Sequence, residues 1–287
     1  MQEDRHKNKY HPYVYISNKV FDEIIEYYCD NGVRFIGPES IQDIGNEDFD
    51  GINCLITFDD GYYNNFFVLD VLEKYNIKVL LYPVKEQIVR QQSFWWEVFY
   101  NKQITHMPFE AVYEDIQNLK LYKYNHIISI LSDRFGKEGF LELSDYNRPM
   151  TLEELKKIKE HPLIELGAHS TAHERLTNLS DKEIENEIGR SKEFLEGITG
   201  HEIKHMSYPF GFFNDNIIHI AEKMGFETSV TSIPGINYLL LDSKKYDWLK
   251  LFRNCIPIPK VMNKSTLRQA KDILNGWKKE IDSNPDI

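Results

Sequence analysis

The sequence predicts an α/β protein with a parallel sheet and one helical insertion. Short apolar runs alternate with amphipathic stretches along most of the 287 residues, a pattern that is typical of βα units. Between about residues 87 and 148, helical periodicity replaces this alternation. Two of the apolar runs are followed directly by polar motifs, Thr-Phe-Asp-Asp-Gly at residues 57–61 and His-Ser-Thr-Ala-His at residues 169–173.

The elements before the insertion follow from apolar spacing and from helix-capping residues. Ser17 can cap a helix that runs to about Gly32, because apolar residues recur after it on one helical face. The elements expected next are a strand over residues 33–36, a strand over 52–58, a helix over 64–75 and a strand over 77–82.

The alternation resumes after the insertion and continues towards the C-terminus. A helix is expected after Thr151, where Thr-Leu-Glu-Glu forms a capping-box signature, and a second capped helix from Ser180 to Gly200. The other expected elements are strands over 163–167, 205–208 and 226–231, a helix over 214–224, one strand within 249–258 and an amphipathic helix over 264–281. We therefore expect a single domain over residues 1–287 that carries the insertion at about 87–148.

Composition narrows the classes of partner and location. The formal net charge is −11 and the isoelectric point about 5.4, which argues against nucleic acid as a partner, because phosphate binding needs a basic surface. Three cysteines without CxxC spacing do not suggest a disulfide framework. No run approaches the roughly 18 apolar residues of a membrane span, and no apolar signal sequence follows Met1. The expected location is cytoplasmic for the chain as written, and periplasmic or extracellular if a leader has been removed; the oligomeric state is not indicated.

The paired carboxylates and the paired imidazoles are each weak signals alone. Asp59 and Asp60 precede a glycine, as in many ordinary turns, and two histidines four residues apart often occur without a metal. Their joint position after apolar strands is more informative, because parallel sheets and barrels bind ligands at the carboxyl ends of their strands. One carboxylate and two imidazoles form a facial metal site with open positions for water and substrate. Adjacent side chains of a strand point to opposite sides, so the second carboxylate can act as a base beside that water.

A third motif, Ser-Tyr-Pro-Phe-Gly at residues 207–211, also follows an expected strand. Pro209 restricts its own φ angle, while Gly211 permits close approach of the backbone. Such a loop can direct the amide of Phe210 at a developing oxyanion. An ordinary β–α turn explains the same residues and remains the alternative.

Together, the motifs at residues 57–61, 169–173 and 208–211 resemble the first three motifs of the polysaccharide deacetylase family, also called the NodB-homology family or family 4 carbohydrate esterases. Their order and spacing agree with that family, and the resemblance extends over roughly residues 15–260. It implies a distorted (β/α) barrel of seven parallel strands. It also implies removal of N- or O-acetyl groups from amino sugars in chitin oligomers, peptidoglycan or exopolysaccharides, with a divalent metal as cofactor.

The resemblance implies a role for each matching residue. Asp59 would be the general base, and the amide of Phe210 would hold the tetrahedral oxyanion. The metal would be bound by Asp60, His169 and His173. The expected metal is Zn²⁺, with Co²⁺, Ni²⁺ or Mn²⁺ as alternatives, and the expected partner is an amino-sugar oligosaccharide or polysaccharide substrate.

Two departures from the family pattern concern the groups that assist the base and supply the acid. Many members carry an Arg that orients the base at the position that holds Ser207 here. Arg253, at the end of an apolar run, could supply that guanidinium or could form an ordinary ion pair. The late Leu-His motif that carries the family's general acid is absent, since no histidine follows His219. These departures resemble a divergent branch of the family that acts on exopolysaccharides or on glycans under assembly.

Aromatic residues near the motifs are the candidates for substrate contacts. Trp95 lies in a Phe-Trp-Trp-Glu segment, and exposed Trp pairs stack on sugar rings; an amphipathic helix that anchors the insertion on the barrel is the alternative. Tyr62 follows the acidic motif directly, and Tyr208 and Pro209 belong to the third motif, so these residues are the other substrate-binding candidates.

The sequence thus predicts a metal-dependent carbohydrate N-deacetylase in which water attacks the acetyl carbonyl directly. No Gly-x-Ser-x-Gly elbow for a covalent nucleophile is present. Two alternatives stay open. One is a weakly active or inactive sugar-binding member of the same fold, and the other is a hydrolase of another amide or of an acylated nucleotide-sugar.

Overall fold

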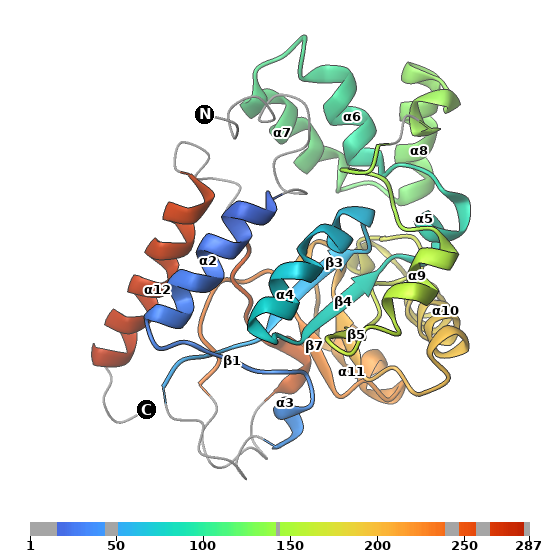
Figure 1. The fold of residues 1–287 in the computed structure, drawn as a ribbon. Helices are drawn as coiled ribbons and strands as arrows, with labels where there is room; N and C mark the ends of the chain where they lie inside the picture. Colours follow the sequence, from blue (N-terminus) through green and yellow to red (C-terminus); the bar gives the residue numbers. More distant parts are fainter. Residues whose placement is uncertain (1–15, 44–50, 142–143, 239–246, 257–264, 284–287) are drawn as a thin grey trace.

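The strands run parallel, as the alternation of apolar and amphipathic segments predicts (Figure 1). The computed structural model describes residues 16–43, 51–141, 144–238, 247–256 and 265–283. The strands within these residues are β1 (Arg34–Phe35), β2 (Asn53–Cys54), β3 (Ile56–Asp60), β4 (Val79–Pro83), β5 (Ile164–Leu166), β6 (His205–Ser207) and β7 (Thr228–Val230). β1 pairs with β2, β4 lies between β3 and β5, and β6 pairs with β7. The α/β class is therefore confirmed.

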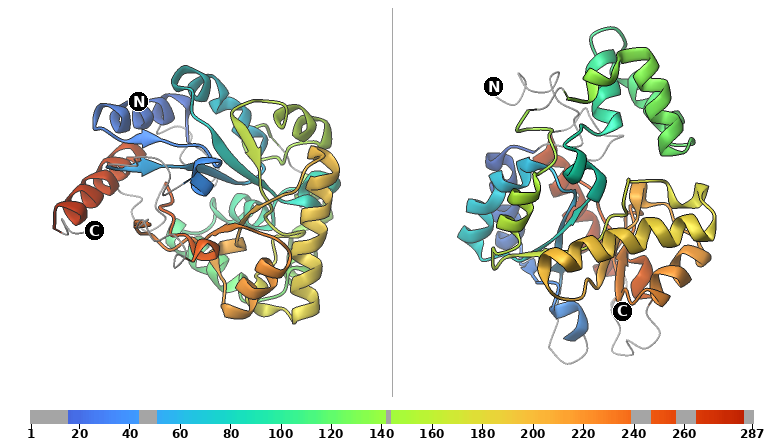
Figure 2. Two further views of the ribbon diagram at one scale, coloured as in Figure 1. Left: turned by 90° about the horizontal axis from the view of Figure 1, so that it is seen from below. Right: turned by 90° about the vertical axis from the view of Figure 1, so that its right-hand side faces the viewer.

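Two isolated bridges extend this pairing into one longer series. Ala168 after β5 pairs with Met206 of β6, and Val230 of β7 pairs with Leu251. A parallel series therefore leads from β3 to Leu251, and Figure 2 shows helices around its outside. Within the described ranges, no strand pairing joins Leu251 back to β3, so closure of the expected barrel is not shown.

The helices outside the strands are α2 (Asn18–Asp30), α3 (Ser40–Asp43), α4 (Leu69–Tyr75), α5 (Lys85–Arg90), α9 (Leu152–Ile158), α10 (Asp181–Thr199), α11 (Asp215–Lys223) and α12 (Thr266–Ser283). Capping residues set the starts of the longer ones. The Ser17 side chain accepts a hydrogen bond from the Val20 amide at the start of α2, and capping boxes open α9 at Thr151 and α10 at Ser180. These starts agree with the sequence prediction. Within the described parts of the chain, no helix has the length and apolar character that crossing a membrane requires.

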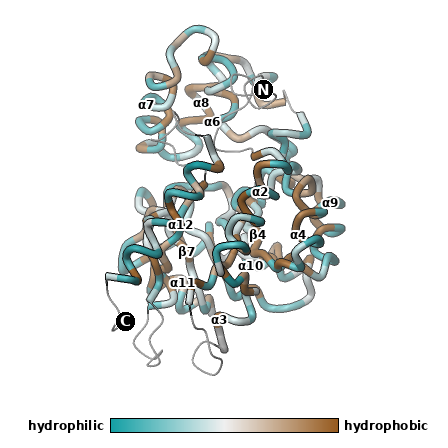
Figure 3. The backbone as a smooth tube through the Cα atoms, turned by 60° about the vertical axis from the view of Figure 1, so that its left-hand side comes forward, coloured by the Kyte–Doolittle hydropathy of each residue, from teal (hydrophilic) through white to brown (hydrophobic). Residues whose placement is uncertain are grey.

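The described residues of the insertion after α5 fold into three α-helices and a 3₁₀ turn with an apolar core of their own. These elements are α6 (Trp95–Gln103), α7 (Phe109–Leu119), α8 (Tyr124–Phe135) and the 3₁₀ turn η2 (Lys137–Leu141). Figures 1 and 3 show these helices as a group at the end of the sheet towards which β4 points. The core of the insertion contains Phe94, Trp95 and Trp96, so the aromatic run at its start joins it to the strands. The helical insertion is therefore found where periodicity predicts it.

Two segments differ from the expected elements. The strand expected within 249–258 is reduced to the single bridge at Leu251, because a 3₁₀ turn, η6 (Trp248–Lys250), precedes it, with Asp247 accepting a hydrogen bond from the Leu249 amide. Residues 257 and 258 lie outside the described ranges. The helix expected over 64–75 begins as a 3₁₀ helix, η1 (Tyr63–Val68), and becomes α-helical only in α4.

Gly167, which joins β5 to the histidine motif, has no room for a side chain. A Cβ atom there would lie 2.6 Å from Cδ1 of Tyr82 and 2.8 Å from the His205 carbonyl oxygen. We expect Gly167→Ala to lower the free energy of unfolding by about 1–3 kcal/mol, since backbone and a packed ring must shift. Urea denaturation measures this change.

Gly197→Ala is the matched control, because Gly197 lies inside α10 and a Cβ atom there would have no neighbouring atom within 4 Å. It should stabilise the protein by roughly 0.5–1 kcal/mol, as alanine does in helix interiors. Equal stability of the two variants would contradict the close packing at Gly167.

Candidate metal centre

The two adjacent aspartates at the end of β3 face different partners. Asp60 has a φ angle of 70° and Gly61 one of 77°, so the chain turns sharply as it leaves the strand. Gly61 is required here, because a Cβ atom would lie 2.7 Å from Cβ of Pro83. The carboxylate of Asp59 is directed at Arg253, and that of Asp60 at His169 and His173.

The two histidines come from the loop that follows β5. Positive φ angles at Ser170 (62°) and His173 (55°) coil this loop, and the Ser170 hydroxyl accepts a hydrogen bond of 3.0 Å from the His173 amide. Nδ1 of His169 lies 2.8 Å from the carbonyl oxygen of Ser207. A carbonyl only accepts, so Nδ1 carries the proton and Nε2 keeps a free lone pair, the arrangement found in metal-binding histidines.

The three groups meet at one point. Oδ1 of Asp60 lies 3.5 Å from Nε2 of His169 and 3.3 Å from Nε2 of His173. The ligand atoms of the three residues all lie within 4.8 Å of one another, and Oδ1 of Asp60 is buried without a hydrogen-bond partner. Ligands of a tetrahedral zinc ion are about 3.3 Å apart, given metal–ligand bonds of about 2.0–2.1 Å. The donor set therefore fits a divalent metal.

Burial sets the protonation of these three groups. It raises the pKa of Asp60 well above its ordinary value, and the neighbouring Asp59 adds to this effect. Burial lowers the pKa of His169, and lowers that of His173 still further. The imidazoles are therefore neutral at pH 7, which is the form that binds a metal, and a bound cation would offset the cost of ionising Asp60.

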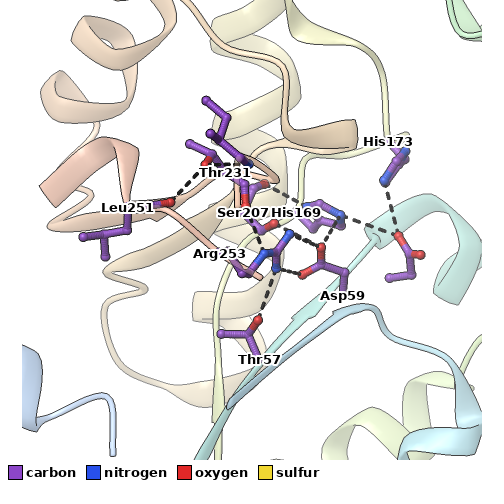
Figure 4. Close-up of polar contacts among 10 residues, drawn as sticks. Thr57, Asp59, His169, His173, Ser207, Thr231, Leu251 and Arg253 are labelled. Carbon is purple, nitrogen blue, oxygen red and sulfur yellow. Dashed lines mark hydrogen bonds and ion pairs between the residues drawn. The ribbon is translucent and has the colours of Figure 1, made fainter. Parts of the chain in front are cut away.

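Asp59 is held by the most extensive polar contacts of the site (Figure 4). Nη1 and Nη2 of Arg253 donate to its two carboxylate oxygens over 2.7 and 2.6 Å, and the Ser207 hydroxyl lies 3.3 Å from Oδ2. Arg253 is itself oriented by the Thr231 carbonyl and the Thr57 hydroxyl. Burial opposes ionisation of Asp59, but Arg253, together with His169 and His173, outweighs it and lowers the pKa of this carboxyl to about 2. The structure thus brings Arg253 to Asp59, next to the position where Ser207 replaces the family's Arg.

The third motif places an aromatic ring against the histidines. Phe210 has a φ angle of 57°, and its ring centroid lies 4.3 Å from that of His173 in an edge-to-face arrangement. Trp96 of the insertion contacts the same histidine, with ring centroids 4.8 Å apart. The metal centre therefore has an apolar wall made of residues from two distant parts of the sequence.

The four residues expected to contact substrate are instead buried in this structure. The Tyr62 hydroxyl accepts a hydrogen bond of 3.0 Å from Nε1 of Trp96, and the Tyr208 hydroxyl donates to the Leu249 carbonyl over 2.7 Å. Trp95 packs in the core of the insertion, and Pro209 is also buried. The alternative interpretation of Trp95 as a core residue describes the structure, because the insertion encloses this side chain as it packs onto the strands.

Several residues near the site are missed by sequence reasoning. One oxygen of Glu187 accepts hydrogen bonds from the amides of Thr171 (3.1 Å) and Ala172 (2.9 Å) and so holds the histidine loop. Lys120 and Glu97 of the insertion also lie near Asp60, whose charge influences the pKa of both. All three belong to helical segments where a charged residue carries no motif, so no sequence signal singles them out.

A surface hollow of about 450 Å³ lies away from the metal centre, at the ends of β4 and β5 where these strands begin. Residues that line it include Lys78 and Leu163.

These features define an α/β protein with a candidate mononuclear metal centre at the carboxyl ends of parallel strands, beside a carboxylate–arginine pair. A family profile described as polysaccharide deacetylase matches residues 47–229. The chain belongs to the polysaccharide deacetylase family.

Individual relatives are distant in sequence. YxkH of Bacillus subtilis (strain 168) is 22% identical over 223 residues, which cover 77% of this chain and 60% of that protein. The chain thus spans less than two thirds of that relative's length. The structure of the Streptococcus pyogenes deacetylase PplD in complex with acetate superposes with a TM-score of 0.55 at 19% identity, over 83% of this chain and 80% of PplD. IcaB from Ammonifex degensii gives a TM-score of 0.59 at 18% identity, over 89% and 90% of the two chains. These structures show a shared fold.

His173→Ala tests the metal centre directly. We expect the wild-type protein to bind one zinc ion, and the variant to bind it at least about 10²-fold more weakly because one of three ligands is removed. Isothermal titration calorimetry with the metal-free protein measures both affinities.

His161→Ala serves as the control, since His161 contacts Glu73 far from the motifs. Zinc affinity that is equal in the wild type and both variants would show that the histidine loop does not bind the metal.

Proposed function

We propose that this protein hydrolyses the N-acetyl group of an amino sugar within a glycan, using a divalent metal held by Asp60, His169 and His173. The observation that carries this proposal is the meeting of three ligand atoms within 4.8 Å, directly beside a carboxylate that Arg253 keeps ionised. Zinc is the first choice of metal, because two imidazoles and one carboxylate leave a coordination position for water. When bound, the metal would acidify water and polarise the acyl carbonyl.

The residues of the chain supply the remaining functions. Asp59 accepts a proton from the attacking water, and its low pKa keeps it in the basic form at neutral pH. Arg253 orients that carboxylate through two hydrogen bonds. The amide of Phe210, in a loop with a positive φ angle, is proposed to donate to the oxyanion of the tetrahedral intermediate. Water attacks directly, so no covalent intermediate is needed.

The substrate class rests on the family. Acetate release from N-acetylglucosamine oligomers by the zinc-loaded protein would support the deacetylase function. Zinc binding without release of acetate or another acyl group would favour the sugar-binding alternative, and release only from other amides or acylated nucleotide-sugars would favour the other hydrolase.

Asp59→Asn removes the proposed base while keeping the shape of the side chain. We expect kcat to fall by about 10²- to 10⁴-fold, the usual contribution of a general base, while zinc affinity changes little. Acetate release and calorimetry measure the two effects separately.

Asp70→Asn, an exposed substitution in the first turn of α4, is the control and should keep full activity. Full activity of Asp59→Asn at saturating zinc would contradict the role of this residue.

Arg253→Gln tests the cause of the low pKa of Asp59. Arg253 lowers that pKa, so its removal should raise it, and the acidic limb of the kcat/KM profile should move to higher pH. In the variant, Asp59 then loses its proton within the measured pH range, and activity rises as it does so. In the wild type, Asp59 is deprotonated over that whole pH range.

Arg90→Gln, on the exposed side of α5, should leave the profile unchanged. An acidic limb at the same pH in Arg253→Gln and the wild type would show that Arg253 does not govern the protonation of Asp59.

A further inference from the structure

In the proposed reaction, no residue has yet been assigned to donate the proton that the leaving amine needs. The nitrogen of the departing amine must gain a proton as its bond to the acyl carbon breaks, and no histidine follows His219 to supply it. Asp59 is committed to the proton of the attacking water. A second proton donor must therefore face the site from another part of the chain.

Most titratable groups near the site are unsuited to this transfer. The Tyr208 hydroxyl donates to the Leu249 carbonyl, and Arg253 is bound to Asp59. Tyr62 and Glu97 are enclosed between the insertion and the strands, with exposed fractions of 3% and 0%. Among the described residues that face the metal centre, these groups do not present a proton to a substrate.

Lys120 is placed differently. It follows α7 at the surface of the insertion that faces the site, and its Nζ lies 4.7 Å from the centroid of the Phe210 ring. Phe210 in turn contacts His173, and the two residues line one small recess together with Lys120. Nζ donates to Oε1 of Gln117 over 3.2 Å, and no carboxylate of the described residues forms an ion pair with it. Lys120 is only partly buried, although the recess itself has no room for a water molecule.

The charges around Lys120 tune its acidity. Burial lowers its pKa to about 8, the attraction of Asp60 opposes this shift, and the repulsion of Arg175 adds to it. His173 and Glu174 line the same recess, and the pKa of Glu174 is raised to about 7. An ammonium group with this acidity is protonated at neutral pH and gives up its proton far more readily than an ordinary lysine.

We propose that Nζ of Lys120 donates the proton to the leaving amine, in place of the histidine that the chain lacks. This inference rests on the proposed function. Water adds to the acyl carbon and passes one proton to Asp59; the C–N bond then breaks with its electron pair moving to nitrogen, and Lys120 protonates that nitrogen. Acetic acid and the free amine leave, and the proton on Asp59 returns through solvent to the neutral Lys120.

A lysine at this position could instead act only by its charge or by packing against Phe210. Lys120→Arg separates these roles, because arginine keeps the charge and the contact with the ring but does not give up its proton. We expect Lys120→Arg and Lys120→Gln each to lower kcat on N-acetylglucosamine oligomers by about 10²-fold or more, with little change in KM. The wild-type activity should fall as pH rises through about 8, and this basic limb should be absent from both variants.

The sharpest test uses 4-nitrophenyl acetate as a second substrate, because 4-nitrophenolate leaves without being protonated. At saturating zinc, both Lys120 variants should hydrolyse this ester at rates close to wild type. The control is Lys123→Gln, three residues away, whose ammonium forms an exposed ion pair with Glu183; it should be unchanged on both substrates.

The outcomes distinguish the failure of this inference from the failure of the proposed function. Amide hydrolysis that is retained by Lys120→Gln or restored by Lys120→Arg would overturn the role of Lys120 alone. Equal losses on the amide and the ester would show that Lys120 supports the structure of the site, which also overturns it. A zinc-loaded wild type that releases acetate from neither substrate would refute the proposed function, and the role of Lys120 with it.

Discussion

The contact between Arg253 and Asp59 is the interaction on which the arrangement of the site depends. Partial removal of these two ions from water costs free energy, and a two-point hydrogen-bonded geometry offsets that cost. The structure supplies that geometry, since both terminal nitrogens of Arg253 reach both oxygens of Asp59. Arg253 follows Leu251, the last member of the parallel series, and Asp59 lies in β3, the first. The side chains thus connect two ends of the series for which the described residues show no backbone pairing.

This contact also explains why two neighbouring carboxylates differ in their pKa values. Asp59 is drawn towards Arg253 and has a low pKa, whereas Asp60 is buried against two neutral imidazoles and has a raised one. Without the guanidinium, two partly buried carboxylates at adjacent positions would compete for one proton. Four non-glycine residues with positive φ angles lie around the same point, namely Asp60, Ser170, His173 and Phe210. Each such conformation costs on the order of 1–3 kcal/mol outside glycine, so the surrounding hydrogen bonds must hold it, as Glu187 does for the histidine loop.

The sequence predicts those features that depend on neighbouring residues. Capping boxes at Thr151 and Ser180 indicate where helices begin, and apolar runs indicate the strands. The grouping of Asp60 with His169 and His173 is also predictable, because each motif follows a parallel strand and such strands end at one edge of the sheet. Periodicity does not reveal which way an insertion folds back. The position of Lys120 over Phe210, and the burial of Trp95, depend on that direction and become visible only in three dimensions.

The insertion changes the physical properties of the metal centre as well as covering it. Trp96 stacks on Phe94 with centroids 4.6 Å apart, and Phe210 and Trp96 both contact His173. The exposed fractions of the side chains are 1% for His169 and 5% for His173, but 27% for Asp59 and 19% for Asp60. The aromatic wall therefore excludes water from the imidazole side, where low polarity strengthens every charge interaction, including that between Lys120 and Asp60. The side of the two carboxylates is the more exposed side of the site. In the proposed reaction, a substrate on this side would lie between Asp59 and the insertion, so the groups proposed to take up and to donate a proton come from distant parts of the chain.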